Sequence, residues 1–264
     1  VKTLSFKEFL AFKESRTGAP CRDIRREFEK FARGGGFPIT NTYDCEYEDA
    51  YRIVRDIYTS VLLRDTIQRH NIRNIDMLDR IVKYVFDNLG NTFSAKNIAD
   101  YFKSQRRKLD IDTVYNYLAA LESAFVVSRV SRYDIKGREI LKTMEKFYVA
   151  DHSLIYAALG YKDRIISGIL ENIVMHEIER RGYKAYVGKL GDSEVDFIGE
   201  RGGERIYVQV AYLVGGSGAT FDREFSPLLA IKDNYPKYVL SMDDLCGDGV
   251  DGVRHLHIAD FLNE

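Results

Sequence analysis

Residues 170–212 constrain the fold of this chain more than any other stretch. The run LENIVMHEIERRG (170–182) is expected to be a helix, and three short runs with strand character follow it: YKAYVGK, SEVDFIGE and RIYVQVAYLV. Glycines punctuate these runs, at Gly182, Gly191, Gly199, Gly202 and Gly203. The pattern predicts a helix that leads into a three-stranded meander.

Acidic residues occupy two places in this stretch, Glu171 on the predicted helix and Asp196 inside the middle predicted strand. This layout resembles the PD-(D/E)XK class of metal-dependent endonucleases, in which a helix adds a Glu, one strand an Asp and the next strand a (D/E)-x-K motif. Such carboxylates hold a hard cation such as Mg²⁺, and the lysine orients or activates the attacking water. The resemblance implies a nuclease-like site with Asp196 as a metal ligand.

The third strand departs from this pattern. Its sequence VQVA places Gln209 and Ala211 on one face, where the resemblance calls for a carboxylate and a lysine. Glutamine offers only a neutral carbonyl oxygen, and alanine offers no ligand. A catalytic site made of Glu171, Asp196 and Gln209 is therefore expected to be inactive. A structural interpretation of Asp196, bound by backbone amides or facing solvent, stays open.

Residues 71–141 predict a compact module of three helices and a hairpin. Asp76, Ser94 and Asp112 are candidate N-caps of the helices. The β runs FVVSRVSRYD and REILKT follow, in the order of a winged helix, whose third helix can enter a major groove. The next run, KFYVADHSLIYAALG (146–160), is expected to be a separate short strand followed by a helix.

Candidate nucleic-acid-binding residues lie on the third helix of this module, in the turn before it and at the hairpin tip. Basic side chains there would neutralise phosphates, and an asparagine can read an adenine edge. The residues are Arg106, Arg107, Lys108, Thr113, Tyr115, Asn116, Lys136 and Arg138. Asp110, Asp112 and Asp134 dilute this positive charge. Because winged helices also dock proteins, binding of a protein partner or a second copy is the alternative.

Composition narrows the function classes further. The net charge of the 264 residues is −1, so binding to DNA would have to use a local basic patch. Cys21, Cys45 and Cys246 lie far apart and form neither a zinc signature nor a disulfide framework, which fits a reducing cytosol. No apolar run approaches the ~18 residues of a membrane-spanning helix. We therefore expect a cytoplasmic protein with no membrane partner.

The first 70 residues are expected to be helical. Ser5 and Glu8 predict a capping box for the first helix, and the run DIRREFEKFAR ends at the breaker Gly34–Gly36. A third helical stretch runs from about Glu46 to Arg69. Its apolar face is expected to contain Ile53, Ile57, Val61 and Leu62.

Several runs resemble a family of prokaryotic AAA-type ATPases. LSFKEFL, the Gly-Gly-x-Pro of Gly35–Pro38 and LLRDTIQRHNI resemble the later part of the ATPase. TVYNYLAALESAFVV, KFYVADHSL, SEVDFI and YVQVAY resemble its C-terminal region of unknown function. The chain contains no G-x-x-x-x-G-K-[ST] phosphate-binding loop. The resemblance implies that the chain begins after the ATPase core, that ATP belongs to the parent protein, and that Arg64 beside Asp65 is either a lid residue or a surface ion pair.

Together these observations predict an α/β (α+β) chain in three parts. Residues 1–70 are the helical remnant and lid of an AAA-type ATPase, 71–141 a winged helix, and 142–264 a restriction-endonuclease-like αβββαβ core. The expected function is nucleic-acid binding beside a degenerate nuclease fold, so that this part alone is neither an ATPase nor an active nuclease. One alternative is a Mg²⁺-dependent DNA endonuclease with a lysine supplied from elsewhere, such as Lys189 or Lys232. The other is a protein-docking module.

Overall fold

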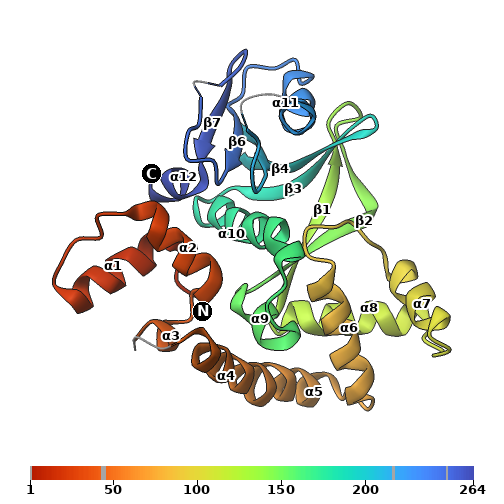
Figure 1. Cartoon of the computed structure of the whole chain (residues 1–264). Coiled ribbons are helices and arrows are strands. Elements are labelled where there is room, and N and C mark those ends of the chain that lie inside the picture. Colours follow the sequence, from red (N-terminus) through yellow and green to blue (C-terminus); the bar gives the residue numbers. More distant parts are fainter. Residues whose placement is uncertain (1, 43–45, 216–217, 248) are drawn as a thin grey trace.

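The computed structural model describes residues 2–42, 46–215, 218–247 and 249–264, and only the backbone of residues 61–63, 65, 142 and 143. Cys45 and the side chains of Val61, Leu62 and Asp65 therefore lie outside the described residues. The described chain contains twelve α-helices and one seven-stranded mixed sheet (Figure 1). The expected mixed α/β class is confirmed.

The N-terminal part is helical, as predicted. It comprises α1 (Phe6–Thr17), α2 (Ile24–Gly34), α3 (Pro38–Thr42), α4 (Tyr47–Ile57), a π-helical turn (Tyr58–Leu63) and α5 (Arg64–His70). The predicted capping box is present: the Ser5 side chain accepts from the Glu8 backbone N–H, and the Glu8 side chain accepts from the Ser5 backbone N–H.

The Gly-Gly-x-Pro run joins this helical part to the core through Asp151. Its carboxylate accepts from the backbone N–H of Gly36 at 2.8 Å and from that of Ser153 at 3.0 Å. Gly35 has a φ of +81°, and a Cβ there would lie 2.4 Å from an Asp151 carboxylate oxygen. Only glycine meets both conditions, so the run is needed for a close backbone approach.

The middle part has the predicted order of three helices and a hairpin. It comprises α6 (Ile75–Asp87), α7 (Ala95–Ser104), α8 (Ile111–Ser123), β1 (Val127–Asp134) and β2 (Glu139–Val149). The Ser94 cap is confirmed. The other two caps were wrong: Asn74 caps α6 through the Met77 N–H, because the helix begins one residue before Asp76. Likewise α8 begins before Asp112, which lies in its first turn.

The C-terminal part contains the predicted helix and meander. It comprises α9 (Ser153–Leu159), a 3₁₀ turn (Asp163–Ile165), α10 (Ile166–Arg180), β3 (Lys184–Leu190), β4 (Ser193–Arg201), β5 (Glu204–Val210), α11 (Ala219–Leu229), β6 (Lys237–Ser241), β7 (Val253–His257) and α12 (Ile258–Asn263).

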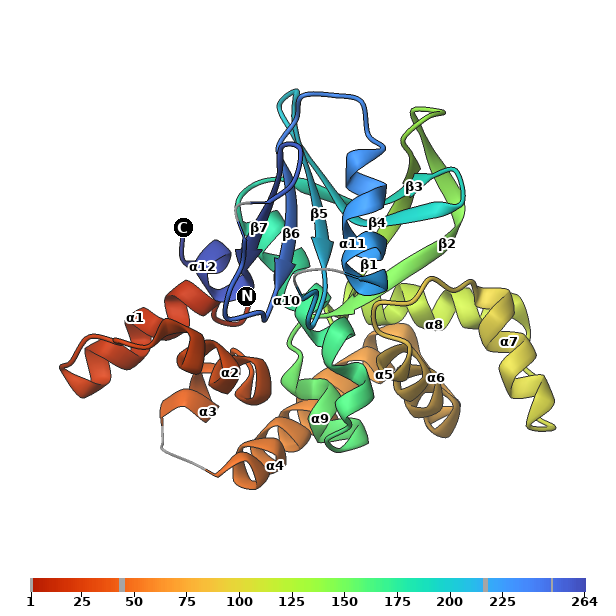
Figure 2. The same ribbon diagram turned by 45° about the horizontal axis from the view of Figure 1, so that its top comes forward.

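The sheet has the strand order β2-β1-β3-β4-β5-β6-β7. β1 pairs with β3, β5 with β6 and β6 with β7 in parallel, and the remaining neighbours are antiparallel. Figure 2 shows α10 and α12 on one side of the sheet and α11 on the other. Apolar side chains fill both interfaces, with Phe197 and Val208 in the α10 core and Tyr207 and Val239 in the α11 core.

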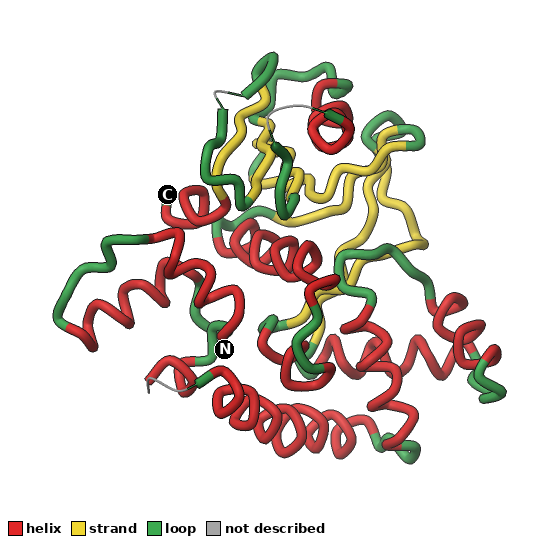
Figure 3. The backbone as a smooth tube through the Cα atoms, viewed as in Figure 1, coloured by secondary structure: helices red, strands yellow, loops and turns green. Residues whose placement is uncertain are grey.

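The β1–β2 hairpin belongs to the same sheet as the meander, as the continuous strands of Figure 3 show. The boundary expected between residues 141 and 142 falls inside β2, which runs unbroken from Glu139 to Val149. The run expected to be a separate short strand at residues 146–149 is therefore the second half of this strand. As a consequence, β2 carries side chains from the helical module into the core of the C-terminal part.

Two bulges redirect side chains in this sheet. The first bulge lies in β4, opposite β3. Between the pairs Tyr186↔Ile198 and Gly188↔Val195, β3 has one residue and β4 has two, Asp196 and Phe197. In β2, the register shifts between the partners of Val130 and Arg132, and Met144 has a φ of +62°. Because a bulge changes which face the following side chains point to, the alternation expected of a regular strand does not hold at either place.

Candidate functional site

Four charged side chains meet at the junction of β2, α10 and β4. The Lys146 Nζ lies 3.1 Å from Glu171 Oε2, 2.9 Å from Glu194 Oε1 and 3.1 Å from Asp196 Oδ1. We call Lys146, Glu171, Glu194 and Asp196 the carboxylate–lysine cluster. The side chain of Lys146 is 2% exposed and that of Glu194 is 37% exposed, so the cluster is buried on three sides and meets solvent at Glu194.

Neighbouring groups hold the buried carboxylates in place. The Tyr148 hydroxyl donates to Glu171 Oε2 at 2.9 Å, and its ring packs against Phe197. Asp196 Oδ2 accepts from the backbone N–H of Val210 at 3.0 Å. Asp196 thus binds a backbone amide, as the structural interpretation expects, and the lysine ammonium at the same time.

Gln209 lies next to Asp196 but faces away from the lysine. Its Oε1 accepts from the Asp196 backbone N–H at 3.3 Å, and its Nε2 donates to Glu224 Oε2 on α11 at 2.9 Å. Ala211 is buried in the α11 core, on the same side of the sheet. Of the three catalytic candidates, the structure therefore joins Glu171 and Asp196 through Lys146 and uses Gln209 as a bridge to α11.

Burial and the neighbouring charged groups shift the pKa values of Glu171 and Lys146. Burial, together with the nearby Asp196, raises the pKa of Glu171 to about 8, against the lowering effects of Lys146 and Tyr148. Burial alone would lower the pKa of Lys146. The acidic groups around Lys146 outweigh this effect and raise its pKa well above the ordinary value. The lysine is therefore the permanent positive charge of the cluster at neutral pH.

The segment after α6 covers the cluster from the side of the helical module. A Cβ at Gly90, where φ is +78°, would lie 2.9 Å from Glu171 Oε1. A Cβ at Gly168 on α10 would lie 2.6 Å from the backbone oxygen of Leu89. Two glycines thus allow the segment to pack directly on α10 and to bury Glu171.

We expect Gly168→Ala to lower the free energy of unfolding by about 1–3 kcal/mol, because the added methyl group overpacks against the Leu89 backbone. In an open helix the same change would instead stabilise by about 1 kcal/mol. Urea denaturation measures the difference. Gly247→Ala is the control, since a Cβ there meets nothing within 4 Å. A Gly168→Ala variant as stable as the unchanged chain would contradict the close packing.

The cluster does not fit the Mg²⁺ that the endonuclease resemblance implies. The carboxylates are ligands of the right type, but their oxygens converge on the Lys146 ammonium, where a metal ion would have to lie. Among the described residues, no three acidic, histidine or cysteine side chains are arranged to hold a metal ion. Neither Lys189 nor Lys232 takes part in these contacts, and Lys232 donates to the Leu229 carbonyl oxygen.

The candidate nucleic-acid-binding residues form two separate groups. Tyr115 and Asn116 are exposed on α8, Thr113 is half-buried there, and Arg106 and Lys108 are exposed in the turn before it. Lys136 and Arg138 are exposed in the β1–β2 turn. Figures 1 and 2 both show this hairpin turn and the α7–α8 turn at opposite ends of the β1–β2 and α6–α8 region. The hairpin tip therefore does not extend the α8 surface.

Arg107 differs from its two neighbours in the turn. Its Nη1 lies 3.1 Å from Asp76 Oδ2, and that carboxylate also pairs with Arg80. The Asp76 carboxylate offsets part of the positive charge of Arg107. Arg106 and Lys108 are the exposed cations that the turn presents to solvent.

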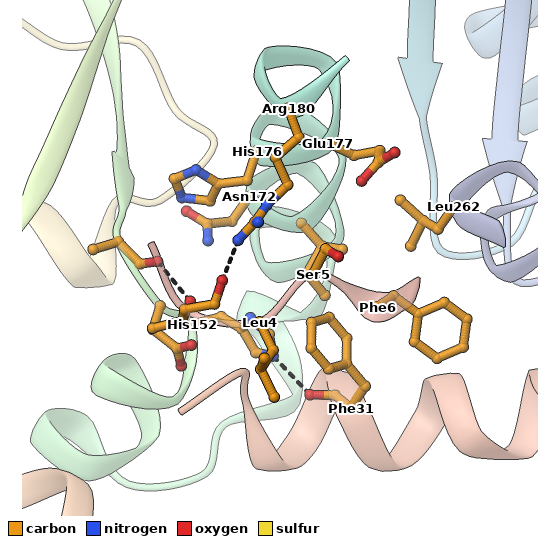
Figure 4. A pocket seen from close by; sticks show the side chains of 14 residues that line it. Leu4, Ser5, Phe6, Phe31, His152, Asn172, His176, Glu177, Arg180 and Leu262 are labelled. Atoms are coloured by element: carbon orange, nitrogen blue, oxygen red, sulfur yellow. Dashed lines mark hydrogen bonds between the residues drawn. The ribbon is translucent and has the colours of Figure 1, made fainter. Parts of the chain in front are cut away.

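A second buried polar region lies where the N-terminal segment crosses α10 (Figure 4). The His152 ring contacts the Phe31 carbonyl oxygen at 2.7 Å, and the His176 ring contacts that of Val149 at 2.7 Å. Arg180 donates to the Thr3 carbonyl oxygen. The pocket between these groups is about 30 Å³, which is room for one or two water molecules. These polar groups bind backbone carbonyl oxygens of neighbouring segments, so we assign them a structural role rather than a role in ligand binding.

Sequence reasoning did not identify Lys146, Tyr148 or Glu224 as part of a site. A signal existed for the first two: Lys146 opens the run KFYV, in which all four residues are buried. A lysine within an apolar strand requires a buried counter-charge. Because the bulge lies just before Lys146, the alternation of side chains along β2 does not predict which face of the sheet Lys146 occupies.

The fold and cluster define a mixed α/β protein with three acidic side chains around a buried lysine. Residues 25–164 match a family described as a domain of unknown function (DUF8612), and the chain belongs to this family. It is 32% identical over 259 residues to an uncharacterized protein of Haemophilus influenzae, and 28% identical over 218 residues to one of Methanocaldococcus jannaschii. No solved structure matches the chain.

These alignments cover 98% and 79% of this chain but only 63% and 48% of the two relatives. The chain thus spans about half to two thirds of the length of the curated relatives it matches. Within the described residues, each helix is too short or too polar to cross a bilayer.

Proposed function

We propose that this chain is a DNA-binding region of a larger AAA-type ATP-dependent protein, and that its nuclease-like core does not cleave. The observation that carries the proposal is the exposed face of α8, directly after the cationic turn. That face presents Ile111, Asp112, Tyr115, Asn116 and Ala119. It has a single charge near its start, and its aromatic and amide side chains suit contacts with base edges in a major groove.

The position of Lys146 supports the proposal that the nuclease-like core does not cleave DNA. An ammonium group already satisfies the carboxylates that would hold a catalytic metal ion. The assignment of ATP to the rest of the protein is supported by the resemblance to AAA-type ATPases and by the missing phosphate-binding loop. It is compatible with relatives that are longer than this chain.

We expect Arg106→Glu/Lys108→Glu to weaken binding to duplex DNA at least ~10-fold, and to reduce the slope of log affinity against log salt by about 2, because two phosphate contacts are lost. Fluorescence anisotropy with labelled duplex across a salt series measures both. Leaving Arg107 unchanged preserves its pair with Asp76.

The matched control is Lys7→Glu/Lys232→Glu, which makes the same charge change at exposed positions on α1 and after α11. Equal affinities for the two double variants would contradict the α8 surface as the binding site. Binding that is insensitive to salt, or no binding at all, would favour protein docking instead. The exposed Ile111, at 41% on this face, and Phe125, at 80% just after α8, would then be the docking contacts.

A Mg²⁺-dependent endonuclease is the second candidate function, favoured by one observation: Lys146 supplies from β2 the lysine that β5 lacks. In this function Lys146 would leave the carboxylates and act on the attacking water when a metal ion binds. The same titrations, run with Mg²⁺ and read on a denaturing gel, distinguish the two. Cleavage that Asp196→Asn abolishes would establish the nuclease and refute the silent core.

A further inference from the structure

We propose that Lys146 is the resident cation of the carboxylate–lysine cluster and excludes divalent metal ions from it. The inference rests on the part of the proposed function that makes the core silent, and it is independent of DNA binding by α8. It assigns to the lysine the position and the charge that a metal ion would have among Glu171, Glu194 and Asp196.

The geometry leaves room for one cation only. Three carboxylate oxygens approach the Lys146 Nζ from two elements, α10 and β4, at 2.9–3.1 Å. The ammonium group donates hydrogen bonds to Glu171 Oε2 and Asp196 Oδ1, and it forms an ion pair with Glu194 Oε1. A divalent ion would need the same oxygens at about 2.0–2.6 Å, and it would meet the lysine charge in the same space.

The backbone holds the lysine in this position. Lys146 pairs with Val130 of β1 immediately after the bulge in β2. Three residues later, Asn172 of α10 binds the backbone of the same strand. Its Oδ1 accepts from the Val149 N–H at 2.7 Å, and its Nδ2 donates to the Val149 carbonyl oxygen at 3.1 Å. Asn172 is fully buried. The strand therefore cannot slide away from α10 without breaking this pair.

Removing the lysine would change the chemistry of the cluster without removing a carboxylate. Asp196 keeps its bond from the Val210 N–H, and Glu171 keeps its bond from the Tyr148 hydroxyl. Glu194, which is 37% exposed, gives an ion from solvent a path to the other two. Closing three oxygens inward by less than about 1 Å then makes a hard-cation site of oxygen ligands. Such a site would take Mg²⁺ or Mn²⁺.

The experiment is a titration with Mn²⁺ alone, read by calorimetry and by thermal unfolding, on the unchanged chain, Lys146→Met and Lys146→Met/Asp196→Asn. We expect no saturable binding to the unchanged chain. Lys146→Met should bind Mn²⁺ at least ~10-fold more tightly, with a rise in melting temperature on saturation, and the double variant should lose this gain. Lys189→Met, on the strand beside Glu194, is the control and should behave like the unchanged chain.

Loss of the lysine can impair folding, so Lys146→Met/Glu171→Gln is a second variant, with one buried carboxyl group fewer. A variant that folds only with Mn²⁺ supports the proposal. A variant that stays unfolded with and without Mn²⁺ contradicts it, because a metal ion in the site should compensate the same carboxylates. Equal Mn²⁺ affinity of the unchanged chain and Lys146→Met would also overturn it. None of these outcomes depends on whether the chain binds DNA.

Discussion

The free energy of unfolding is expected to fall by about 3–5 kcal/mol when Lys146 is replaced by methionine in the absence of metal ions, the range for breaking a buried ion pair by removing one partner. Methionine has nearly the volume and shape of the lysine stem, so the loss reports the charge rather than a cavity. Asp196 and Glu171 are almost fully buried and would keep no positive partner within the cluster. Urea denaturation measures the change.

A double variant tests whether the lost charge, rather than altered packing, causes this decrease in stability. Lys146→Met/Asp196→Asn removes one buried carboxylate with the lysine and should recover part of the stability, because less uncompensated charge stays buried. Lys232→Met, at an exposed position, should change the free energy of unfolding by less than about 0.5 kcal/mol, as surface substitutions do. If the double variant were less stable than Lys146→Met alone, packing rather than charge would be the cause.

The acidic half of the site was predictable because it is local. The helix carrying Glu171 and the strand carrying Asp196 belong to one stretch with clear periodicity, and both elements lie where the pattern indicated. The two side chains come together once the meander packs against the helix that precedes it. Gln209 also lies on the expected strand, on the same side of the sheet as Ala211.

The lysine was not predictable from local pattern. Lys146 is 25 residues from Glu171 and 50 from Asp196 in sequence. It reaches them only because β2 continues through a bulge that a sequence pattern does not show. The expected division at residue 141 left Lys146 in the same part as Glu171 and Asp196, but no sequence pattern assigned it a role there. The parallel pairing of β1 with β3 is what brings the two halves into one sheet, and this pairing is a tertiary choice.

This continuity has a consequence for how the two surfaces relate. The hairpin that follows α8 also carries Lys146, so this hairpin directly connects the proposed DNA-binding helix to the carboxylate–lysine cluster. A substitution in the cluster is therefore not automatically separate from α8. The Lys146→Met variant should be tested for DNA affinity before any loss of binding by other cluster variants is assigned to direct contact.

The unfolding free energy of the unchanged chain, relative to that of Glu171→Gln, is expected to fall as pH rises from about 5 to about 8. The pKa of Glu171 is raised from 4.5 to about 8 by burial and the nearby Asp196. Between these two values the folded chain holds a proton that the unfolded chain has released. Folding then takes up a proton, so the free energy of unfolding decreases with pH and becomes flat above about 8.

The size of this effect follows from the shift. Each pKa unit corresponds to about 1.4 kcal/mol, so the full window contributes on the order of 4 kcal/mol. The measurement is the difference in unfolding free energy between the unchanged chain and Glu171→Gln from about pH 5 to about pH 9, which cancels the titration of groups common to both. Glu194→Gln is the control, because its carboxylate is half exposed to solvent and its removal leaves the Glu171 proton in place. Parallel curves for the unchanged chain and Glu171→Gln would mean that Lys146 keeps Glu171 ionised throughout, and the cluster would then carry a full pair of buried anions around its lysine.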